Sequence, residues 1–531
     1  MLTRVILEKI TVLIKRKVLI LFDRSYTGEV DEKLDNLRKD FVKFRRPEEG
    51  EKRVLKKLVK LEADLDSFLG PWMAVSRMGQ EVYPSQGLLL TPFDQLDMVG
   101  LKTLPQDKIL ETLRLRLFFL ELFNHPYRIH FLEQVSTGSF QPPPKIKSDV
   151  IDNAIATGFA LSIWDLGATT NGTNKERTQR TLRYGEGPFV KLGRQARTFF
   201  VGSANPDVWG TSASIATLAA THCLAGIPRN GLFGQVSRQT DLAREVFTQL
   251  NSIAEVVLAG REDKQKVLRY WRKNPMGVVE PSPDDALRRA EALYGVGVRA
   301  FRIYSPEPGT GPVATTLALR KRFGREVEIV TGQIVDVNQA KRAEAAGADS
   351  IYVGIGGGGR CTTGVRSGSA IDWPELVWRL RGEINIPIIV EGGGSDHVST
   401  TLLLGASGIG ISRIGAGGTV ESPGGMLYCV GGDGQMFKPY GGEASARAKY
   451  GEGKILPFGI PSFIEGETNR AEINYVMNAR PTVAYNLHLL IEDAILTLVF
   501  RGVDDLHQLQ VIDPSPLRQV SPLGRAQILT H

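Results

Sequence analysis

Cysteine is scarce in this sequence, and its scarcity excludes two classes of protein. Only Cys223, Cys361 and Cys429 occur in 531 residues, and they lie far apart. Three separate cysteines cannot build the disulfide framework of a small secreted domain or a cysteine-rich zinc cluster. We therefore expect a cytoplasmic protein in a reducing compartment.

Long uninterrupted apolar runs are also missing, although the N-terminus comes close to one. The stretch "MLTRVILEKITVLIKRKVLILF" is interrupted by charges at Arg4, Glu8, Lys9 and Lys15. It therefore offers no continuous span near the ~20 apolar residues that a membrane-crossing helix needs, and no cleavage site of a signal peptide follows it. An amphipathic packing element is expected, with a protein or peripheral membrane contact through residues 1–50 as the alternative.

A strong excess of one charge sign is absent as well. The formal net charge is +7, and both signs are mixed along the chain. A balance of this kind gives little support to nucleic-acid binding, so no nucleic-acid partner is expected. Hydrophobic residues make up 42% of the sequence, which allows a large core and more than one structural unit.

The pattern of residues divides the chain into three parts. Residues 1–150 are predicted to form a helical N-terminal extension of unknown function, because segments such as "EKRVLKKLVKLEADLDSFL" place apolar residues three and four apart. The prolines of "FQPPPK" end this part. Residues 151–194 are interpreted as a basic linker or entry segment.

Residues 195–515 alternate short β-branched runs, such as "SIYVGIG" and "PIIVEGG", with amphipathic helical stretches. Strand–helix–strand alternation predicts βαβ units and a parallel sheet. About eight such units predict an α/β fold, namely a (β/α)8 TIM barrel preceded by the mainly helical N-terminal region.

Polar and glycine residues follow several of the predicted strands. Barrel strands direct their carboxyl ends to one face, where such barrels build their active sites. The loop "VGIGGGGRCTTG" (353–364) places Cys361 after one of these strands. Because consecutive glycines let a ligand approach the backbone, we favour a functional thiol over an inert thiol in a surface turn.

Several motifs, in the right order, resemble the IMP dehydrogenase/GMP reductase family. "GADSIYVGIGGGGRCTTG" is similar to the catalytic loop of that family, and "VTGQIVDVNQAKRAEAAGA" to a strand and helix before it. "IPIIVEGGGS", "AGGTVESPGG" and "FKPYGGEASARAKYGEGK" resemble segments after it. The resemblance covers residues 195–510. It implies a barrel enzyme acting on a purine 5′-monophosphate and, by analogy, a homotetramer. The tandem regulatory domains that most IMP dehydrogenases insert are absent from the sequence.

The resemblance also implies catalytic roles. The thiolate of Cys361 would attack C2 of the purine base and form a covalent adduct. Thr363 would hydrogen-bond the reacting centre or an attacking water, and Glu452 is the candidate general acid/base. Backbone carbonyls of Gly356, Gly358 and Cys361 resemble those that bind a monovalent cation, so potassium is a candidate ion.

Binding residues are carried over by position as well. Glu391 stands where the family has its ribose-binding aspartate, and Arg413 could add a charge-assisted phosphate contact. The candidate substrate-binding residues are Ser203, Glu391, Gly393, Ser412, Arg413, Tyr440, Gly442 and Glu443. The candidate residues for NAD or NADP are Tyr304, Ser305, Gln333, Gly354 and Gly356. Tyr304 and Tyr352 replace an acidic and a basic residue of the family, respectively, and both rings can stack on a flat ligand.

The resemblance leaves the reaction open. IMP dehydrogenases carry a mobile flap before the carboxylate that corresponds to Glu452, whereas only Gly451 separates Tyr450 from Glu452 here. "CTTGVRSGSAIDWPEL" also resembles the GMP reductase pattern, while "ESPGG" resembles the dehydrogenase one. We expect an IMP dehydrogenase-like enzyme. The alternatives are a GMP reductase, a flavin-dependent barrel oxidoreductase and a non-catalytic nucleotide-binding homologue.

Overall fold

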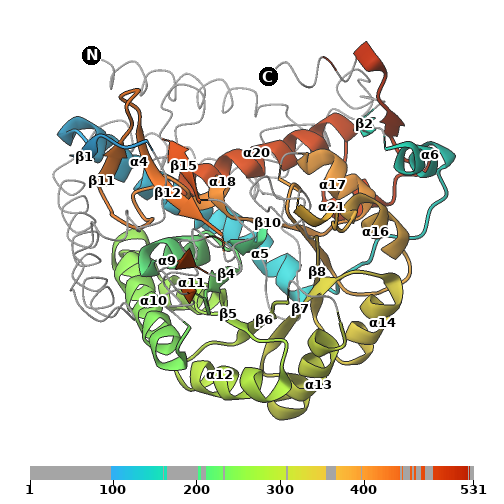
Figure 1. Cartoon of the computed structure of the whole chain (residues 1–531), viewed down its shortest axis with the longest axis horizontal. Coiled ribbons are helices and arrows are strands. Elements are labelled where there is room, and N and C mark those ends of the chain that lie inside the picture. The colour runs from blue at the N-terminus through green and yellow to red at the C-terminus, as the bar shows by residue number, and fades with distance from the viewer. Residues whose placement is uncertain are drawn as a thin grey trace.

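Eight parallel strands close into a barrel in the computed structural model of the chain (Figure 1). Each strand is hydrogen-bonded to two neighbours, and β10 returns to pair with β3. In chain order the strands are β3 (Val201–Ala204), β4 (Ala225–Ile227), β5 (Pro275–Val279), β6 (Ala300–Ile303), β7 (Glu328–Ile334), β8 (Ser350–Val353), β9 (Ile388–Glu391) and β10 (Gly408–Ile411). The predicted (β/α)8 barrel is confirmed.

The structure describes residues 97–158, 161–163, 201–204, 211–230, 234–305, 309–354, 366–395, 397–442, 445, 455–456, 460–461, 468–472, 482–523 and 526. The proposed contact through residues 1–50 lies outside these ranges, as does most of the predicted segment 151–194. The boundaries predicted for the three parts of the chain therefore remain predictions.

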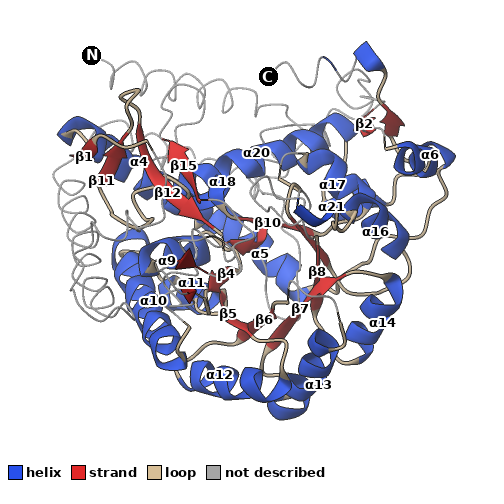
Figure 2. Ribbon diagram, viewed as in Figure 1, coloured by secondary structure: helices blue, strands red, loops and turns tan. Residues whose placement is uncertain are grey.

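Helices surround the barrel, as Figure 2 shows. Strands β5 and β7 are buried along their whole length because one side faces the barrel interior and the other is covered by helices. Asp336 caps the start of one helix by accepting a hydrogen bond from the Gln339 backbone N–H at 2.8 Å. The helices are α9 (Ser212–Ala220), α10 (Val236–Val257), α11 (Lys264–Trp271), α12 (Pro283–Gly295), α13 (Gly311–Phe323), α14 (Val337–Ala345), α16 (Trp373–Leu380), α17 (Val398–Leu404), α18 (Arg413–Ala416), α20 (Val483–Arg501) and α21 (Leu506–Gln510).

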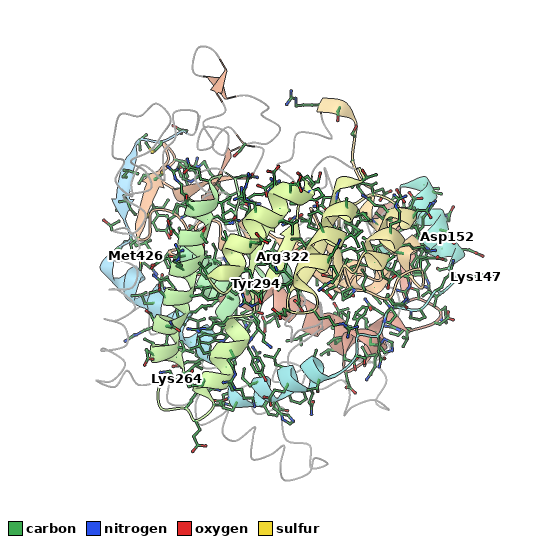
Figure 3. All side chains as sticks on the ribbon, turned by 90° about the horizontal axis from the view of Figure 1, so that it is seen from below. Lys147, Asp152, Lys264, Tyr294, Arg322 and Met426 are labelled. Carbon is green, nitrogen blue, oxygen red and sulfur yellow. The ribbon has the colours of Figure 1, made fainter. Side chains whose placement is uncertain are left out.

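Two helices of the N-terminal region pack directly on the barrel. They are α4 (Gln106–Phe123) and α5 (Pro126–Thr137). Leu113, Leu120 and Phe123 are fully buried and belong to the same hydrophobic core as the barrel strands. In Figures 1 and 3, α5 lies across one end of the barrel. This part of the chain and the barrel therefore share one core.

Small sheets lie outside the barrel. An antiparallel sheet joins β1 (Gly100–Thr103), β11 (Leu427–Val430), β12 (Met436–Gly441) and β15 (Thr468–Glu472), so segments far apart in the sequence pair with one another. Strands β2 (Leu161–Ile163) and β16 (Leu517–Gln519) form a second sheet, and β13 (Ile455–Leu456) and β14 (Ile460–Pro461) form a third.

The helix α6 (Asp149–Thr157) is attached to the barrel through Asp152, which accepts a hydrogen bond from the Trp378 indole N–H at 2.8 Å. In Figure 3, Asp152 and Met426, which directly precedes β11, lie on opposite sides of the molecule. The additions to the barrel therefore occupy two separate regions.

Among the described residues, α20 is the one helix that is long and apolar enough to cross a membrane. However, 67% of its apolar window is buried inside the protein. Its buried side chains, among them Leu487, Ile491 and Ala494, belong to the main core. Its apolar composition is therefore explained by packing within the barrel protein.

Candidate active site

Most of the predicted site residues that the structure describes lie where barrel strands end. Tyr304 and Ser305 follow β6, and Gly354 follows β8. Gln333 lies near the end of β7, Glu391 is the last residue of β9, and Ser412 follows β10. Parallel strands bring these positions to one face of the barrel, which we call the rim. Cys361, Thr363, Gly356, Gly358, Glu443 and Glu452 lie outside the described residues.

Strand register places Ser203 level with Glu391, with β10 between them, although the two are far apart in the sequence. Ser203 on β3 pairs with Gly410 on β10, and Gly410 pairs with Glu391 on β9. A Cβ on Gly410 would lie 3.3 Å from the Cβ and Cγ of Glu391, which is tighter than ordinary contact. A glycine at position 410 therefore leaves room for the Glu391 side chain at the rim.

The carboxylate of Glu391 is held by two donors, both on the same oxygen. Arg302 forms an ion pair with Oε2 through Nη2, and Gln333 donates to the same Oε2 through Nε2 at 2.7 Å. The Arg302 side chain is 3% exposed, whereas that of Glu391 is 28% exposed. One end of this pair is therefore buried in the barrel, and the other faces the rim.

Two tyrosine rings flank the Arg302 guanidinium. Its Cζ lies 4.2 Å from the ring centroid of Tyr352 and 4.8 Å from that of Tyr304. Tyr352 is fully buried and Tyr304 is half-buried. Cation–π contacts of this kind stabilise a desolvated guanidinium and fix its plane. Arg302, Tyr304, Gln333, Tyr352 and Glu391 are called the rim cluster below.

The amide oxygen of Gln333 is an unused acceptor. Gln333 is 2% exposed, and its Oε1 has no hydrogen-bond partner among the described residues. Buried polar atoms are nearly always paired, so an unpaired one at a barrel rim indicates a position for a ligand donor. The rim cluster therefore presents Gln333 Oε1 close to the Glu391 carboxylate.

Gly354 allows β8 and β9 to approach closely at the rim. Its φ is +121°, and a Cβ there would lie 1.9 Å from the Glu391 carbonyl oxygen. Any other residue would push the two strands apart. The predicted catalytic loop therefore begins from a position directly beside Glu391, since the chain continues from Gly354 toward Cys361.

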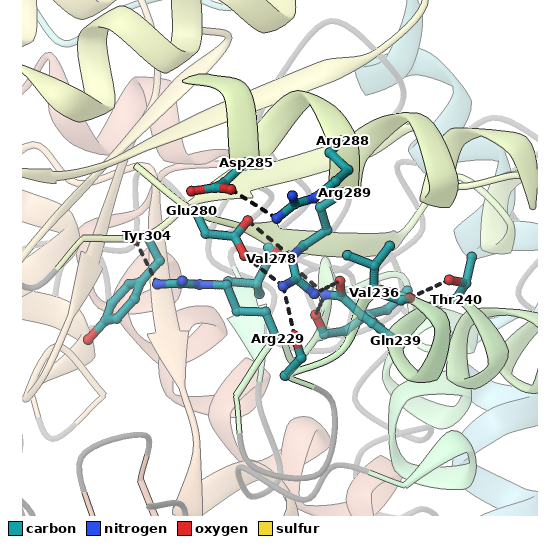
Figure 4. A network of polar contacts seen from close by, with 12 residues as sticks. Arg229, Val236, Gln239, Thr240, Val278, Glu280, Asp285, Arg288, Arg289 and Tyr304 are labelled. Carbon is teal, nitrogen blue, oxygen red and sulfur yellow. Dashed lines mark hydrogen bonds and ion pairs between the residues drawn. The ribbon is translucent and has the colours of Figure 1, made fainter. Parts of the chain in front are cut away.

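A second polar network supports the loops after β4, β5 and β6 (Figure 4). Arg229 donates to the Tyr304 carbonyl at 3.2 Å, which ties the end of β6 to the segment after β4. Arg289 pairs with Glu280 at 2.6 Å and donates to Gln239 Oε1 at 2.9 Å. Gln239 in turn donates to the carbonyls of Ile227 and Val278. Arg229 thus contacts Tyr304 directly, while Arg289, Glu280 and Gln239 join the ends of β4 and β5.

The candidate phosphate-side residues lie on α18 and β12 and directly beside these elements. Ser412 is exposed, and Arg413 is half-buried at the start of the four-residue α18. Tyr440 is 6% exposed on β12. Among the described residues, no hydrogen bond or ion pair joins Ser412, Arg413 or Gly442 to Glu391. Gly393 has a φ of +93° in the turn after β9.

A buried lysine shapes the segment that resembles the family's "AGT-x-ESPGE" motif. Lys438 on β12 is 1% exposed, and its Nζ donates to the carbonyls of Thr419, Ser422 and Gly425 at 2.8, 3.2 and 2.6 Å. Its Nζ also lies 4.6 Å from the ring centroid of Tyr428. The ammonium group therefore fixes the 419–425 turn against β12, the strand that also carries Tyr440.

Two of the three cysteines are structural. Cys223 and Cys429 are both fully buried, and neither is in a disulfide. Burial raises the pKa of the Cys223 thiol to about 12, so this thiol is not ionised at neutral pH. The chemistry proposed for a thiol therefore rests on Cys361.

Sequence reasoning missed Arg302, and a signal for it was present. In "AFRIYS" a single charge stands inside an otherwise apolar strand. A charge in a fully buried strand requires a partner. The pairing with Glu391, 89 positions away, becomes visible only in the barrel.

Comparison with known proteins agrees with the fold and with the motifs. The family model described as "IMP dehydrogenase / GMP reductase domain" matches residues 211–513. The chain is 30% identical over 206 residues to an inosine-5′-monophosphate dehydrogenase of Aquifex aeolicus, covering 36% of this chain and 41% of the relative.

Two further relatives are similarly distant. Inosine-5′-monophosphate dehydrogenase 1 of Arabidopsis thaliana is 30% identical over 220 residues, covering 38% of this chain and 42% of the relative. An inosine-5′-monophosphate dehydrogenase of Helicobacter pylori is 34% identical over 197 residues, covering 34% and 39%. The chain thus matches about two fifths of the length of these relatives.

The family model spans more than half of the chain, and it begins at the N-cap of α9 and ends just beyond α21. It therefore includes strands β4 to β10 and every residue of the rim cluster. The chain belongs to the IMP dehydrogenase/GMP reductase family.

Proposed function

We propose that the protein is an IMP dehydrogenase-like oxidoreductase that converts IMP to XMP with NAD or NADP. The observation that carries the proposal is the Glu391 carboxylate, held at the end of β9 with one oxygen bonded by Arg302 and Gln333. Glu391 stands where the resemblance assigns ribose recognition. Its second oxygen, Oε1, is the acceptor for a ribose hydroxyl of the substrate.

The reaction begins with attack of the Cys361 thiolate on C2 of the purine ring. Departure of the C2 hydrogen as hydride leaves a thioimidate on Cys361. Water then adds at C2 and the carbon–sulfur bond breaks, which releases XMP and the free cysteine. Glu452 takes or gives the proton in these steps, and Thr363 orients the attacking water. Over one cycle IMP, an oxidised nicotinamide and water give XMP, the reduced nicotinamide and a proton.

Two residues of the rim cluster and their neighbours suit a nicotinamide cofactor, which accepts the hydride when bound. Tyr304 offers an aromatic ring at the rim, and Gln333 Oε1 can accept from a carboxamide or hydroxyl donor. Ser305 and Gly354 lie beside them. NADP and a potassium ion at the carbonyls of Gly356, Gly358 and Cys361 belong to the same proposal, as do a homotetramer and a cytoplasmic location.

A specific observation favours a second candidate, a GMP reductase. The segment between Tyr450 and Glu452 is a single glycine, which leaves no room for the flap that activates water in the dehydrogenase reaction. A reductase needs no attacking water at C2, because hydride arrives there and ammonia leaves. The same Cys361 would then form the adduct from GMP.

A paired turnover assay tests both candidates. Purified protein is given IMP, NAD and potassium in one arm, and GMP with NADPH in the other, and absorbance of the reduced nicotinamide is followed. We expect reduced nicotinamide to form in the first arm only, and Cys361→Ala to abolish it. Consumption of NADPH in the second arm alone would establish the reductase, and yellow copurifying FMN would establish a flavin enzyme. Nucleotide binding without turnover or an adduct at Cys361 would favour a binding protein.

A further inference from the structure

Arg302 is an unusual residue for the wall of a barrel. It stands in the middle of β6, paired in register with Val278 on one side and Val330 on the other. It is 2% exposed, and a guanidinium cannot lose its charge readily. A charge in this position is tolerated only when a carboxylate and further polar or aromatic groups surround it. Glu391, Tyr304 and Tyr352 supply that environment.

The geometry of the pair constrains Glu391 through one of its two carboxylate oxygens. Arg302 and Gln333 both donate to Oε2, so two contacts from two different strands fix one oxygen. A carboxylate held by one oxygen keeps a single orientation of its other oxygen. Glu391 has one more methylene than aspartate and therefore one more rotatable bond. Its position at the partly exposed rim would otherwise leave it several rotamers.

We propose that Arg302 is a positioning residue that orients Glu391 Oε1 toward a hydroxyl of the bound nucleotide and thereby makes the site select a ribose diol. The proposal rests on the proposed function, because it assumes that a purine nucleotide occupies the rim. Arg302 acts through Glu391 and does not itself touch the substrate.

The charge of the cluster agrees with a neutral ligand group at this point. The ion pair between Arg302 and Glu391 has no net charge, and no group of acidic, histidine or cysteine side chains among the described residues could hold a metal ion. A free carboxylate would attract a cation, whereas a paired one accepts a hydrogen bond from a hydroxyl. The adjacent Gln333 Oε1 adds a second neutral acceptor.

Arginine is required here rather than any cation. Its planar guanidinium lies over both tyrosine rings while it donates to Glu391. Lysine has no plane to place between the rings and reaches as a single point charge. We therefore expect Arg302→Lys to keep the charge but to leave Glu391 less well oriented, and Arg302→Met to release it.

The experiment measures binding rather than turnover. Dissociation constants of IMP and of 2′,3′-dideoxy-IMP are obtained by calorimetry for the wild type, Arg302→Lys, Arg302→Met and Gln333→Met. We expect the wild type to prefer IMP, and this preference to fall by about tenfold or more in Arg302→Met, as for loss of a hydrogen bond to a charged group. The falls for Arg302→Lys and Gln333→Met should be smaller, and dideoxy-IMP should bind all variants nearly alike.

A matched control comes from the opposite end of the same strands. Arg320 pairs with the buried Asp349, which directly precedes β8 and accepts from the Ile329 backbone N–H at 2.8 Å. Arg320→Met removes a comparable buried ion pair far from the rim. It should lower the melting temperature without changing the preference for IMP over dideoxy-IMP.

The outcomes separate the two proposals. If the wild type binds neither nucleotide, the proposed function and the positioning role both fail. If it prefers IMP and Arg302→Met, Arg302→Lys and Gln333→Met keep that preference, the positioning role alone is wrong. If Arg302→Met does not fold, Arg302→Lys and Gln333→Met decide the question by the same ratio. An equal loss in Arg320→Met would reduce the effect to general destabilisation and overturn the role.

Discussion

Two buried amides of this protein differ in how completely their hydrogen-bonding positions are used. Asn124 belongs to a cluster that joins α4 to the barrel and also contains Arg116, His222, Trp271 and Glu421; we call it the α4 seam. Asn124 there accepts from His222 Nε2 at 2.8 Å and Trp271 Nε1 at 2.9 Å, and donates to the carbonyls of Leu120 and Ala220. All four hydrogen-bonding positions of this amide are thus used.

The Gln333 amide of the rim cluster differs from it. Gln333 is as buried as Asn124, yet its Oε1 has no partner among the described residues. Leaving a buried acceptor unpaired costs about 1–3 kcal/mol. At the barrel rim this cost is offset when a ligand supplies the donor. The Asn124 amide is thus satisfied by the protein alone, whereas the Gln333 amide can be completed by a ligand.

Breaking the ion pair of the α4 seam should have the largest effect on stability. Arg116 and Glu421 are both fully buried and 3.2 Å apart, and Arg116 also donates to Thr217. Arg116→Met leaves the Glu421 charge without its cation, which should cost about 3–5 kcal/mol of unfolding free energy. Urea denaturation measures this loss of unfolding free energy. The exposed pair of Arg288 and Asp285 is the control, and Arg288→Met should leave the denaturation midpoint unchanged. Equal midpoints for the two variants would contradict the prediction.

Removing the central amide of the seam should have the next largest effect. Asn124→Leu leaves the N–H groups of His222 and Trp271 buried without an acceptor, so we expect a loss of about 2–4 kcal/mol. Asn153→Leu on α6 is the matched control, because that amide is exposed. Turnover per folded molecule should remain unchanged in both variants. A seam variant that loses turnover but not stability would reverse the roles assigned to the two clusters.

Acid should weaken the seam through His222. Burial lowers the pKa of His222 to about 3, helped by the nearby charges of Arg128 and Arg261. The unfolded chain binds a proton near pH 6.5, whereas the folded chain does not. The contribution of neutral His222 to the free energy of unfolding is therefore fully present above pH 6.5 and is lost as the pH falls toward 3. The loss at pH 5 should be about 2 kcal/mol.

Thermal unfolding at pH 7 and pH 5 measures this loss. His222 has a φ of +62°, which asparagine tolerates, so His222→Asn is the variant to compare. It should be less stable at pH 7 but should lose less between the two pH values. An equal loss in the variant would assign the acid sensitivity to other groups.

The smallest stability effect is expected at the rim. Gln333→Met removes the unpaired oxygen together with one hydrogen bond to the partly exposed Glu391, so stability should change by no more than about 1 kcal/mol. Binding of IMP should weaken nonetheless. Urea midpoints and calorimetry on the same preparation test the pair of outcomes. A loss as large as that of Asn124→Leu would show that the rim amide serves the fold.

Features that depend on residues close together in the sequence could be predicted, whereas pairings between distant residues could not. Local periodicity predicted the strands in "SIYVGIG" and "PIIVEGG", which the structure contains as β8 and β9, and helices between such runs, because each depends on neighbours a few residues away. Positions at the ends of such strands, including Gln333 and Glu391, could be named as site candidates for the same reason. The antiparallel sheet could not be predicted, because β1 pairs with β11 from more than 300 residues away.

The sequence by itself determined the barrel and the family, and it offered Cys361 as the candidate nucleophile. Its alternation of short apolar runs and amphipathic helices permits few other folds. Its family motifs are continuous stretches of sequence, so they can be recognised without the structure. Only the tertiary structure decided that Arg302 pairs with Glu391, that Gln333 donates to the same carboxylate, and that α4 is bonded to the barrel through Asn124. The physical reason is that a buried charge or amide is stable only beside its partner. The partners lie 89, 58 and 98 positions apart, respectively, along the chain.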